Sequence, residues 1–308
     1  IGRYALRGMG VVAGDVDDDG DTDIYVANDK DMNLLFINNG KGRFTESSMI
    51  LGTGFNANGL PEAGMGVDVG DINRNGLLDI FVTNYSGETN TLYLNQGHGL
   101  FLDETDFKGL GRPSFHFLAF GTKFVDLNLD GWLDLYVGNG HVIDNINLFN
   151  NQYSHRQHDQ IYMNESGTFT DQTKLIGLDL QDKFVTRGVA RADIDNDGDI
   201  DLIISNNNDE ASLLINEGVP QNNWIGFYLK GVEANRQAIG SKIKIHTNSG
   251  SQVSYVNPSG SYLSSNDQRI VFGLGKDEKV KMVEVFWAGG IEKEIFNNLD
   301  SNYYYKII

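Results

Sequence analysis

One nine-residue acidic pattern occurs four times in this chain, at residues 15–23, 71–79, 126–134 and 193–201. Each copy has Asp at positions 1 and 9, Asp or Asn at positions 3 and 5, and Gly at position 6. Oxygen ligands at alternate positions, around a glycine that can adopt positive φ, are what a hard cation such as Ca²⁺ requires of a short loop. The pattern therefore predicts repeated calcium loops that bind up to four Ca²⁺.

Comparison of the copies assigns a role to each position. Positions 1 and 9 are always Asp, so we expect them to contribute carboxylates, whereas position 7 varies freely and is expected to offer its backbone carbonyl. Because ligand charge tunes calcium affinity, loops one and four should bind most tightly, loop three next and loop two least. The predicted metal ligands are Asp15, Asp17, Asp19, Asp21, Asp23, Asp71, Asn73, Asn75, Leu77, Asp79, Asp126, Asn128, Asp130, Trp132, Asp134, Asp193, Asp195, Asp197, Asp199 and Asp201.

The residues after each loop differ from those of an EF-hand. Position 12, where an EF-hand needs a bidentate Glu, is Val or Ile in every copy. Each loop leads into a short apolar run that ends in Asn, at residues 23–28, 79–84, 134–139 and 201–206. These runs are rich in β-branched and aromatic residues and too short for helices, so they are predicted to be buried strands.

The repeated unit extends beyond the loop in both directions. A glycine stands five residues before each first Asp, and a third strand is predicted at residues 34–38, 92–95, 161–164 and 213–216. The first three copies then turn through Gly to Phe44, Phe101 and Phe169. Three or four short strands at a period of 55 to 67 residues indicate the blades of a β-propeller, in an all-β fold.

The motif Gly-x₄-Asp-x-Asp/Asn-x-Asp/Asn-Gly-x-x-Asp, with its following strands, resembles the FG-GAP/VCBS repeat of integrin-type propellers. The resemblance implies that residues 1–222 form calcium-binding propeller blades, with each calcium loop between the first two strands of a blade. It also implies a ring that usually has about seven blades. Since the first blade begins almost at residue 1, we expect these four blades to belong to a larger ring, although four blades could also close by themselves.

Residues 223–308 lack calcium loops and show alternating polar and apolar stretches. Alternation between turn residues predicts a small antiparallel β-domain. The segments 234–240, 260–267 and 272–275 are similar to the ASPIC/UnbV domain, which follows such repeats in cartilage acidic protein-like and many secreted bacterial proteins. The resemblance implies fold and secretion, and no enzymatic activity. Strands are predicted at residues 224–230, 239–246, 252–256, 280–287, 291–296 and 303–308.

Composition excludes several classes of partner. The formal net charge of −18 argues against nucleic acid and anionic membranes, and no apolar stretch approaches the length of a membrane span. Calcium loops of this open kind are expected in the weak affinity range of extracellular modules, which predicts a secreted or cell-surface protein. The absence of Cys favours a bacterial secreted protein over an animal ectodomain.

Three features have both a functional and a structural interpretation. The sequons at Asn84 and Asn164 could accept glycans, but both Asn occupy repeat positions, which favours a strand-ending role. Trp132 either stacks on a sugar or partner or packs against the neighbouring blade. The insertion in copy three, residues 140–163, contains His155 and His158. This pair could bind a transition metal or act as acid and base, yet a long surface loop more often serves recognition.

Two classes of function follow. The first is an adhesion or recognition module, in which calcium rigidifies blades that present loops to an extracellular glycan or protein. The second is a calcium-dependent propeller enzyme, a lyase or hydrolase of extracellular polysaccharide. An enzyme needs a convergent cluster of acid, base and cationic groups, and only the insertion offers a candidate. We therefore expect a binding module without catalytic residues.

Overall fold

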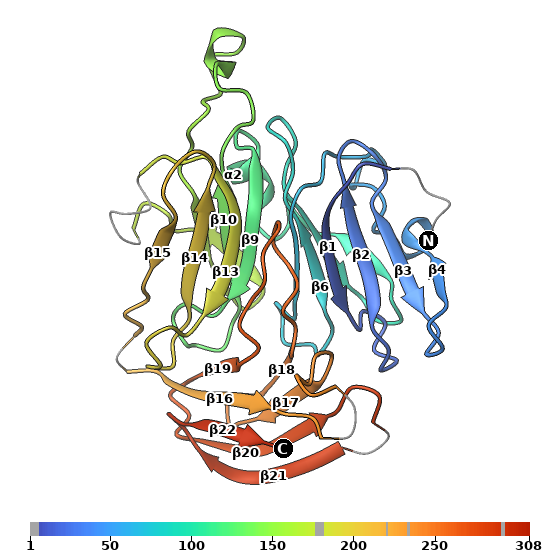
Figure 1. Ribbon diagram of the computed structural model, residues 1–308, viewed down its shortest axis with the longest axis vertical. Helices are drawn as coiled ribbons and strands as arrows, with labels where there is room; N and C mark the ends of the chain where they lie inside the picture. The colour runs from blue at the N-terminus through green and yellow to red at the C-terminus, as the bar shows by residue number, and fades with distance from the viewer. Residues whose placement is uncertain (1–5, 176–181, 220, 233–234, 291–292) are drawn as a thin grey trace.

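The computed structural model describes residues 6–175, 182–219, 221–232, 235–290 and 293–308, and consists mainly of β-strands (Figure 1). Residues 8–214 form four antiparallel sheets whose strands pair in sequence order, as expected for propeller blades. The strands of blades one and two are β1 (Gly8–Gly14), β2 (Asp23–Asn28), β3 (Leu34–Asn38), β4 (Phe44–Glu46), β5 (Val67–Gly70), β6 (Asp79–Val82), β7 (Thr91–Asn95) and β8 (Phe101–Asp103). Those of blades three and four are β9 (Ala119–Val125), β10 (Asp134–Asn139), β11 (Gln160–Glu165), β12 (Thr168–Asp171), β13 (Thr186–Ala192), β14 (Asp201–Asn206) and β15 (Ser212–Leu214).

The hydrophobic core of the blades lies between adjacent sheets. One cluster joins blades one and two, a second joins blades two and three, and a third joins blades three and four. Tyr25 and Tyr93, for example, come from blades one and two, and their ring centroids are 6.5 Å apart. In blades two and three, which have neighbours on both faces, the strands β6 and β10 are buried along their whole length, as predicted. In blade four the predicted buried strand was wrong in part, because β14 leaves Ile203 44% exposed.

The repeated glycine before each loop allows the first strands of successive blades to approach closely. A methyl group on Gly10 would lie 2.4 Å from the carbonyl oxygen of Met65, and one on Gly66 would lie 2.0 Å from that of Phe120. Real side-chain carbon atoms do not come this close to backbone, so a larger residue would force the blades apart.

The C-terminal residues form two sheets around their own core. One sheet has the order β19 (Ile270–Gly275), β16 (Asn223–Leu229) and β22 (Tyr304–Ile307). The other has the order β18 (Ser251–Tyr255), β17 (Lys242–His246), β20 (Lys279–Phe286) and β21 (Lys293–Asp300).

Two details of this domain differ from prediction. The strands β16 and β22 pair in parallel, whereas the other strand pairs described for this domain are antiparallel, as predicted. Strand β19 was not predicted, because its glycines look like turn residues. Residues 291 and 292 of the predicted strand 291–296 lie outside the described residues.

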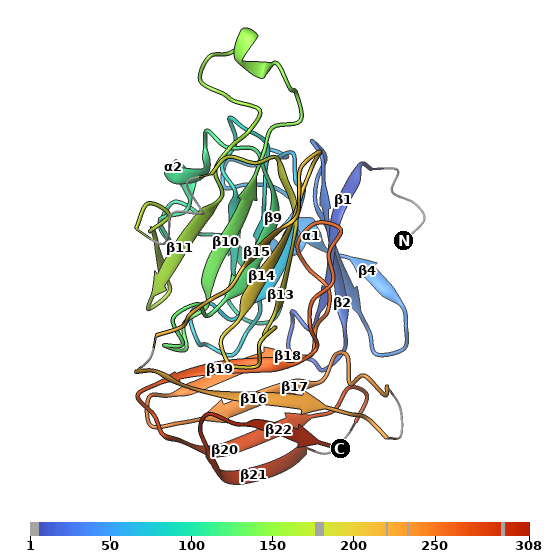
Figure 2. The same cartoon turned by 60° about the vertical axis from the view of Figure 1, so that its left-hand side comes forward.

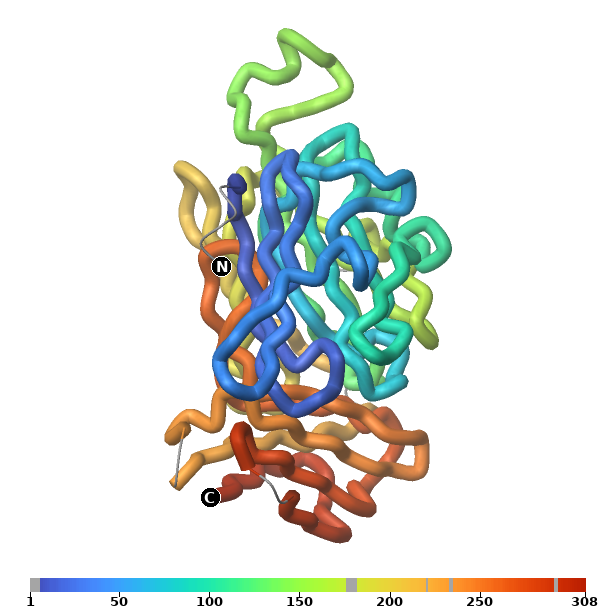
Figure 3. The backbone as a smooth tube through the Cα atoms, turned by 90° about the vertical axis from the view of Figure 1, so that its right-hand side faces the viewer, coloured from blue at the N-terminus to red at the C-terminus, as the bar shows by residue number. Residues whose placement is uncertain are grey.

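The C-terminal domain lies at one end of the blades, and the insertion of blade three projects from the opposite end (Figures 1 and 3). The connection between β18 and β19 rises from the C-terminal domain alongside the blades (Figure 2). The helices are short: α1 (Ser48–Leu51), α2 (Gly111–Ser114) and the 3₁₀ turn η1 (Ile146–Leu148). Within the described residues, no helix has the length and apolar character needed to span a bilayer.

Candidate calcium-binding loops

The four acidic loops connect the first and second strands of their blades and share one backbone conformation. Position 4 is left-handed in every copy, with φ between 58° and 64°, and the glycine at position 6 has φ between 87° and 99°. The residues at position 4 are Asp18, Arg74, Leu129 and Asn196. Two positive φ angles within three residues turn the chain back on itself, which the glycine tolerates without strain.

Side-chain hydrogen bonds fold each loop around its first Asp. In loops one to three, the two carboxylate oxygens of that Asp accept the N–H groups of positions 5 and 6. In all four loops, the side chain at position 5 accepts the N–H of position 7. Both Asp and Asn can accept these bonds, so the loop shape tolerates either residue.

Loops one and four bring three carboxylates together. Oxygens of Asp15, Asp17 and Asp19 lie within 4.8 Å of one another, and so do those of Asp193, Asp195 and Asp197. Buried oxygens without a hydrogen-bond partner occur in these same loops, on Asp17, Asp193 and Asp199. Clustered carboxylates repel unless a cation lies between them, and an all-oxygen donor set suits Ca²⁺. The residues of loops one and four therefore fit calcium.

Burial raises the pKa of the first Asp in loops one, two and three. The pKa of Asp15 rises to about 6, that of Asp71 to about 6 and that of Asp126 to about 7, in each case chiefly because burial disfavours the charged form. A bound cation would reverse this shift, because it stabilises the carboxylate.

Loops two and three offer fewer charges. Asn73 and Asn75 replace carboxylates in loop two, and Asn128 replaces one in loop three. The Asn128 amide donates to the side chain of Asp130 at 3.0 Å, so the two ligand positions also contact each other. The predicted ranking of the loops by charge remains a prediction.

Position 9 has a structural role that the pattern did not reveal. Its carboxylate is buried in all four loops, and its two oxygens accept the N–H of position 2 and the N–H of the Asn on the third strand. For Asp79 these donors are Ile72 at 3.1 Å and Asn95 at 2.8 Å, and burial raises its pKa to about 8. Position 9 braces the loop against the third strand, and it lies outside the two groups of convergent carboxylates found among the described residues.

The side chains at position 7 turn toward neighbouring structure. A methyl group on Gly40 would lie 2.5 Å from an Asp21 oxygen, and one on Gly218 would lie 2.5 Å from an Asp199 oxygen. Trp132 packs under the Arg74 guanidinium of the preceding blade, 4.2 Å from the ring centroid. This contact supports packing against the neighbouring blade for Trp132.

Both members of the predicted pair, His155 and His158, are partly buried. His158 stacks on Phe117 at 4.9 Å, whereas the backbone of His155 bonds to that of His141, which is buried beside Tyr85 and Tyr153. Among the described residues, no group of three potential metal ligands includes a histidine.

The surface part of the insertion is also shorter than the predicted 140–163. Gln157, Asp159 and Gln160 are buried in blade three, because they bond its core: Asp159 accepts from the Tyr136 hydroxyl at 2.5 Å.

The sequon residues Asn84 and Asn164 are buried and donate to neighbouring loops, which supports the structural role favoured by the sequence.

Two sets of residues escaped the sequence interpretation. The residues at position 4 of loops one, three and four contact the C-terminal domain, and the segment 257–267 contacts all four blades. No local pattern marks these contacts, since their partners are distant in sequence.

Comparison with known proteins identifies both parts of the chain. The FG-GAP-like repeat family matches residues 15–82, 71–137 and 126–204, and the ASPIC and UnbV family matches residues 231–308. The chain is 27% identical to human cartilage acidic protein 1 over 296 residues. That alignment covers 94% of this chain and 42% of the relative, so the chain spans about two fifths of the length of that protein.

Solved structures show a weaker likeness. A lectin from Agrocybe aegerita that recognises non-reducing terminal N-acetylglucosamine is 19% identical with a TM-score of 0.43, over 81% of this chain and 60% of the lectin. The exotype rhamnogalacturonan lyase YesX is 14% identical with a TM-score of 0.35, over 88% of this chain and 56% of the lyase.

The curated relatives are vertebrate proteins, which gives no support to the bacterial origin expected from the lack of Cys. The repeat matches extend over residues 15–204, more than half of the chain. The chain therefore belongs to the FG-GAP-like repeat family and carries an ASPIC and UnbV domain after its repeats.

Proposed function

We propose that this chain is a secreted or cell-surface recognition module whose blades are held rigid by calcium. The observation that carries the proposal is the convergence of three carboxylates within 4.8 Å in loops one and four, with buried oxygens that have no partner. Calcium would neutralise these charges and tie the first strand of a blade to its second. Extracellular calcium fills weak sites that cytosolic calcium leaves empty, and the similarity to a cartilage protein supports the same location.

The proposed partner is an extracellular glycan or protein that binds at the end of the propeller opposite the calcium loops. The insertion projects there and exposes Leu148 and Phe149, whose side chains are 76% and 77% accessible. Exposed apolar residues on a projecting loop favour a binding role, because they cost solubility unless a partner covers them.

We also propose that the module is not an enzyme. His158 stacks on Phe117, and Arg156 is paired with Asp209 at 2.6 Å. Among the described residues, no group of three convergent His or carboxylate side chains includes a histidine of the insertion, which supports a binding role. Turnover of a defined polysaccharide by the purified chain would contradict this point and favour a lyase or hydrolase.

The test is a binding screen on immobilised glycans and matrix proteins, run in millimolar calcium and again with excess chelator. We expect binding that requires calcium, together with a calcium content above that of the surrounding buffer when the protein has been dialysed against millimolar calcium. A protein that retains no calcium would contradict the metal sites. Binding that is the same in chelator would contradict the role of calcium in recognition.

A further inference from the structure

The C-terminal domain docks on the calcium loops through position 4. In loop one, the Lys242 ammonium lies 2.5 Å from an Asp18 oxygen, and in loop four the Arg269 guanidinium donates to the Asn196 side chain at 2.7 Å. In loop three, the N–H of Gly275 donates to the carbonyl of Leu129 at 2.8 Å. Position 4 is no ligand in the repeat pattern, yet in loops one, three and four it contacts the second domain, whereas Arg74 of loop two donates to the carbonyls of Asp130 and Gly131 in loop three.

A residue of the last strand also contacts a ligand of loop four directly. The Tyr304 hydroxyl and the N–H of Gly198 both donate to Oδ2 of Asp193, while Oδ1 of Asp193 has no hydrogen-bond partner. Trp224 packs over Gly198, and its ring centroid lies 5.0 Å from that of Tyr304. These contacts orient the Asp193 carboxylate and leave one oxygen for the cation, as outer-shell groups do in other metal sites.

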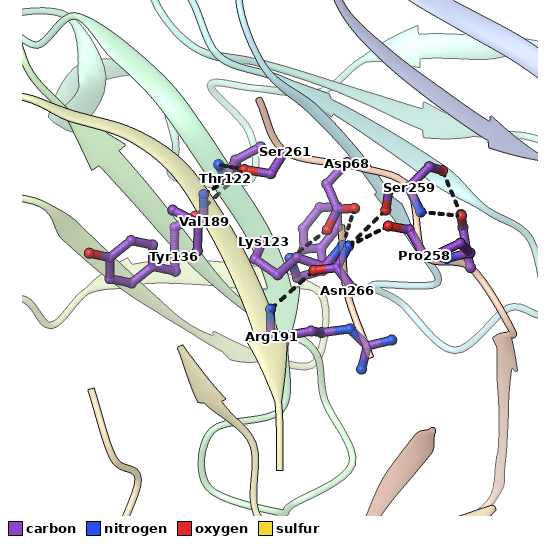
Figure 4. A network of polar contacts seen from close by, with 12 residues as sticks. Asp68, Thr122, Lys123, Tyr136, Val189, Arg191, Pro258, Ser259, Ser261 and Asn266 are labelled. Atoms are coloured by element: carbon purple, nitrogen blue, oxygen red, sulfur yellow. Dashed lines mark hydrogen bonds and ion pairs between the residues drawn. The ribbon is translucent and has the colours of Figure 1, made fainter. Parts of the chain in front are cut away.

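The connection between β18 and β19, residues 257–267, forms a plug against the first strands of the blades (Figure 4). Ser261 exchanges backbone hydrogen bonds with Val67 on β5, and its hydroxyl oxygen accepts the N–H groups of Thr122 on β9 and Val189 on β13, each at 3.2 Å. Asn266 accepts the N–H of Arg191, also on β13, at 3.1 Å. Ser259 also accepts the N–H of Ala13 on β1 at 3.2 Å. One segment of the C-terminal domain therefore ties all four blades together.

The plug takes the place of a neighbouring blade beside Gly188. A methyl group on Gly10, Gly66 or Gly121 would meet a backbone carbonyl of the next blade. That carbonyl belongs in each case to the residue just before the corresponding glycine of that blade. Gly188 instead faces the plug, because a methyl group on it would lie 2.9 Å from the carbonyl oxygen of Tyr262. The plug also covers a buried ion pair, Asp68 with Lys123 at 2.7 Å. Exposure of this pair to water would follow if the plug withdrew.

We propose that the C-terminal domain is a calcium-dependent clamp, in which calcium in loops one and four keeps the domain docked and the plug inserted. The inference rests on the calcium binding proposed above. Without calcium, the clustered carboxylates repel, and the loops lose the shape on which Lys242, Arg269 and Tyr304 dock. Because coupling between two equilibria is reciprocal, docking of the domain must strengthen calcium binding by the same factor.

The absence of Cys from the chain allows a clean test by thiol labelling. Ser261→Cys places a thiol in the plug, where the native side chain is 2% exposed, and Ser241→Cys places a control thiol in the core of the C-terminal domain, where the native side chain is 1% exposed. Chelator should accelerate labelling at position 261 by about tenfold or more, within the usual range of coupling factors, and at position 241 by less than about twofold.

Each other outcome overturns the clamp in a distinguishable way. Equal acceleration at both positions indicates general unfolding. An unchanged rate at position 261, when elemental analysis shows that calcium has left, removes the clamp but leaves the proposed function intact. If the protein binds no calcium before chelator is added, both the clamp and the proposed function are contradicted.

A matched pair of variants tests the coupling from the other domain. Tyr304→Phe keeps the contact with Trp224 but removes the hydrogen bond to Asp193, so it should weaken one calcium site and accelerate labelling at position 261 in calcium. Tyr303→Phe, at a side chain that is 62% exposed, should change neither quantity. Unchanged calcium affinity and labelling in the Tyr304→Phe variant would contradict the coupling.

Discussion

At the scale of single residues, the backbone conformation of the loops does not depend on the charge of the side chain at position 5. The side chain at position 5 accepts the same N–H whether it is Asn75 or Asp197, so an exchange between Asn and Asp changes the ligand charge and little else. Position 9 is a poorer place for such a test. Asp201→Ala would remove the acceptor of two part-buried N–H groups, those of Ile194 and Asn216, and would therefore cost stability with or without calcium.

We predict that Asp197→Asn weakens calcium binding to loop four and that Asn75→Asp strengthens binding to loop two, because carboxylate count tunes affinity. Calorimetric calcium titration of the full chain measures both changes. Melting in chelator serves as the control, since the Asp197→Asn variant should melt within a few degrees of the parent when no metal is bound. Equal affinities in all three proteins would contradict the assignment of position 5 as a ligand.

Glu62 is a buried carboxyl group outside the calcium loops. It accepts hydrogen bonds from Asn56, Asn84 and Thr91, and burial raises its pKa to about 7, with a smaller contribution from the charges of Glu88 and Asp103. Its folded pKa is thus above its value of 4.5 in the unfolded chain. The stability associated with the protonated form is fully present below that value and is lost as the pH rises through about 7.

We predict that Glu62→Gln removes this part of the pH dependence. The free energy of unfolding of the variant relative to the parent should rise between pH 5 and pH 8, by on the order of 2 kcal/mol. Urea unfolding at several pH values, in saturating calcium so that the loops stay occupied, measures the difference. A constant offset between the two proteins across this range would show that Glu62 does not titrate there.

At the scale of elements, an Asn at the end of the third strand ties each blade to the loop of the blade before it. The Asn95 amide donates to the carbonyl of Val16 in loop one, that of Asn164 to Ile72 in loop two and that of Asn216 to Leu127 in loop three. Within the described residues, these bonds therefore join loops one, two and three to blades two, three and four. They also explain why the sequon at Asn164 is buried.

We predict that Asn164→Ala destabilises the propeller by about 1–3 kcal/mol, because the carbonyls of Ile72 and Leu133 lose a buried donor. Asn151→Ala, at an exposed position of the insertion, is the matched control and should stay within about 0.5 kcal/mol. Urea unfolding in saturating calcium compares the two. A cost for Asn164→Ala no larger than that of the control would contradict the inter-blade role.

The insertion behaves as an element separate from the blade beneath it. Its base is closed by the N–H of His141, which donates to the carbonyl of His155 at 2.9 Å, and Tyr153 stacks on the His141 ring. Residues outside this base project into solvent (Figure 3). Only the part beyond the base can therefore be removed without damage to the blade.

We predict that replacing residues 143–152 by a short Gly-Ser linker abolishes partner binding and changes the free energy of unfolding by less than about 1 kcal/mol. The milder double substitution Leu148→Ser and Phe149→Ser should weaken binding in the same way. Phe107→Ser, at a side chain that is 83% exposed on another blade, is the control for loss of surface hydrophobicity. Full binding without the insertion would place the recognition surface elsewhere.

At the scale of the whole molecule, calcium should decide stability. A ligand that binds only the folded state contributes about 2.7 kcal/mol per site when its concentration is a hundred times Kd. We predict that excess chelator lowers the thermal midpoint of the parent strongly. The substitution Asp197→Asn, which weakens loop four alone, should lower the midpoint in calcium by less than chelator does. Calorimetric melting with chelator and with millimolar calcium measures it. A midpoint that chelator leaves unchanged would contradict the role of calcium in the fold.

The sequence predicted the features that depend on neighbours along the chain. Ligand oxygens at alternate positions, a glycine at position 6 and a following apolar run are all local, so their fourfold repetition identified the loops and the strands β2, β6, β10 and β14. Strand β19 escaped because Gly273 and Gly275 resemble a turn, while in the structure Gly273 allows the strand to lie against Asp126.

The features that join distant segments were decided by tertiary structure alone. The bonds that Asn95, Asn164 and Asn216 donate to the loop of the preceding blade, and the position of the plug, depend on how strands from different repeats pack. Ser261 meets Thr122 across 139 residues of chain and Val189 across 72. A sequence pattern records which atoms a residue offers, whereas the partner of a hydrogen bond between distant residues is set by the packing of the blades, which no local spacing encodes.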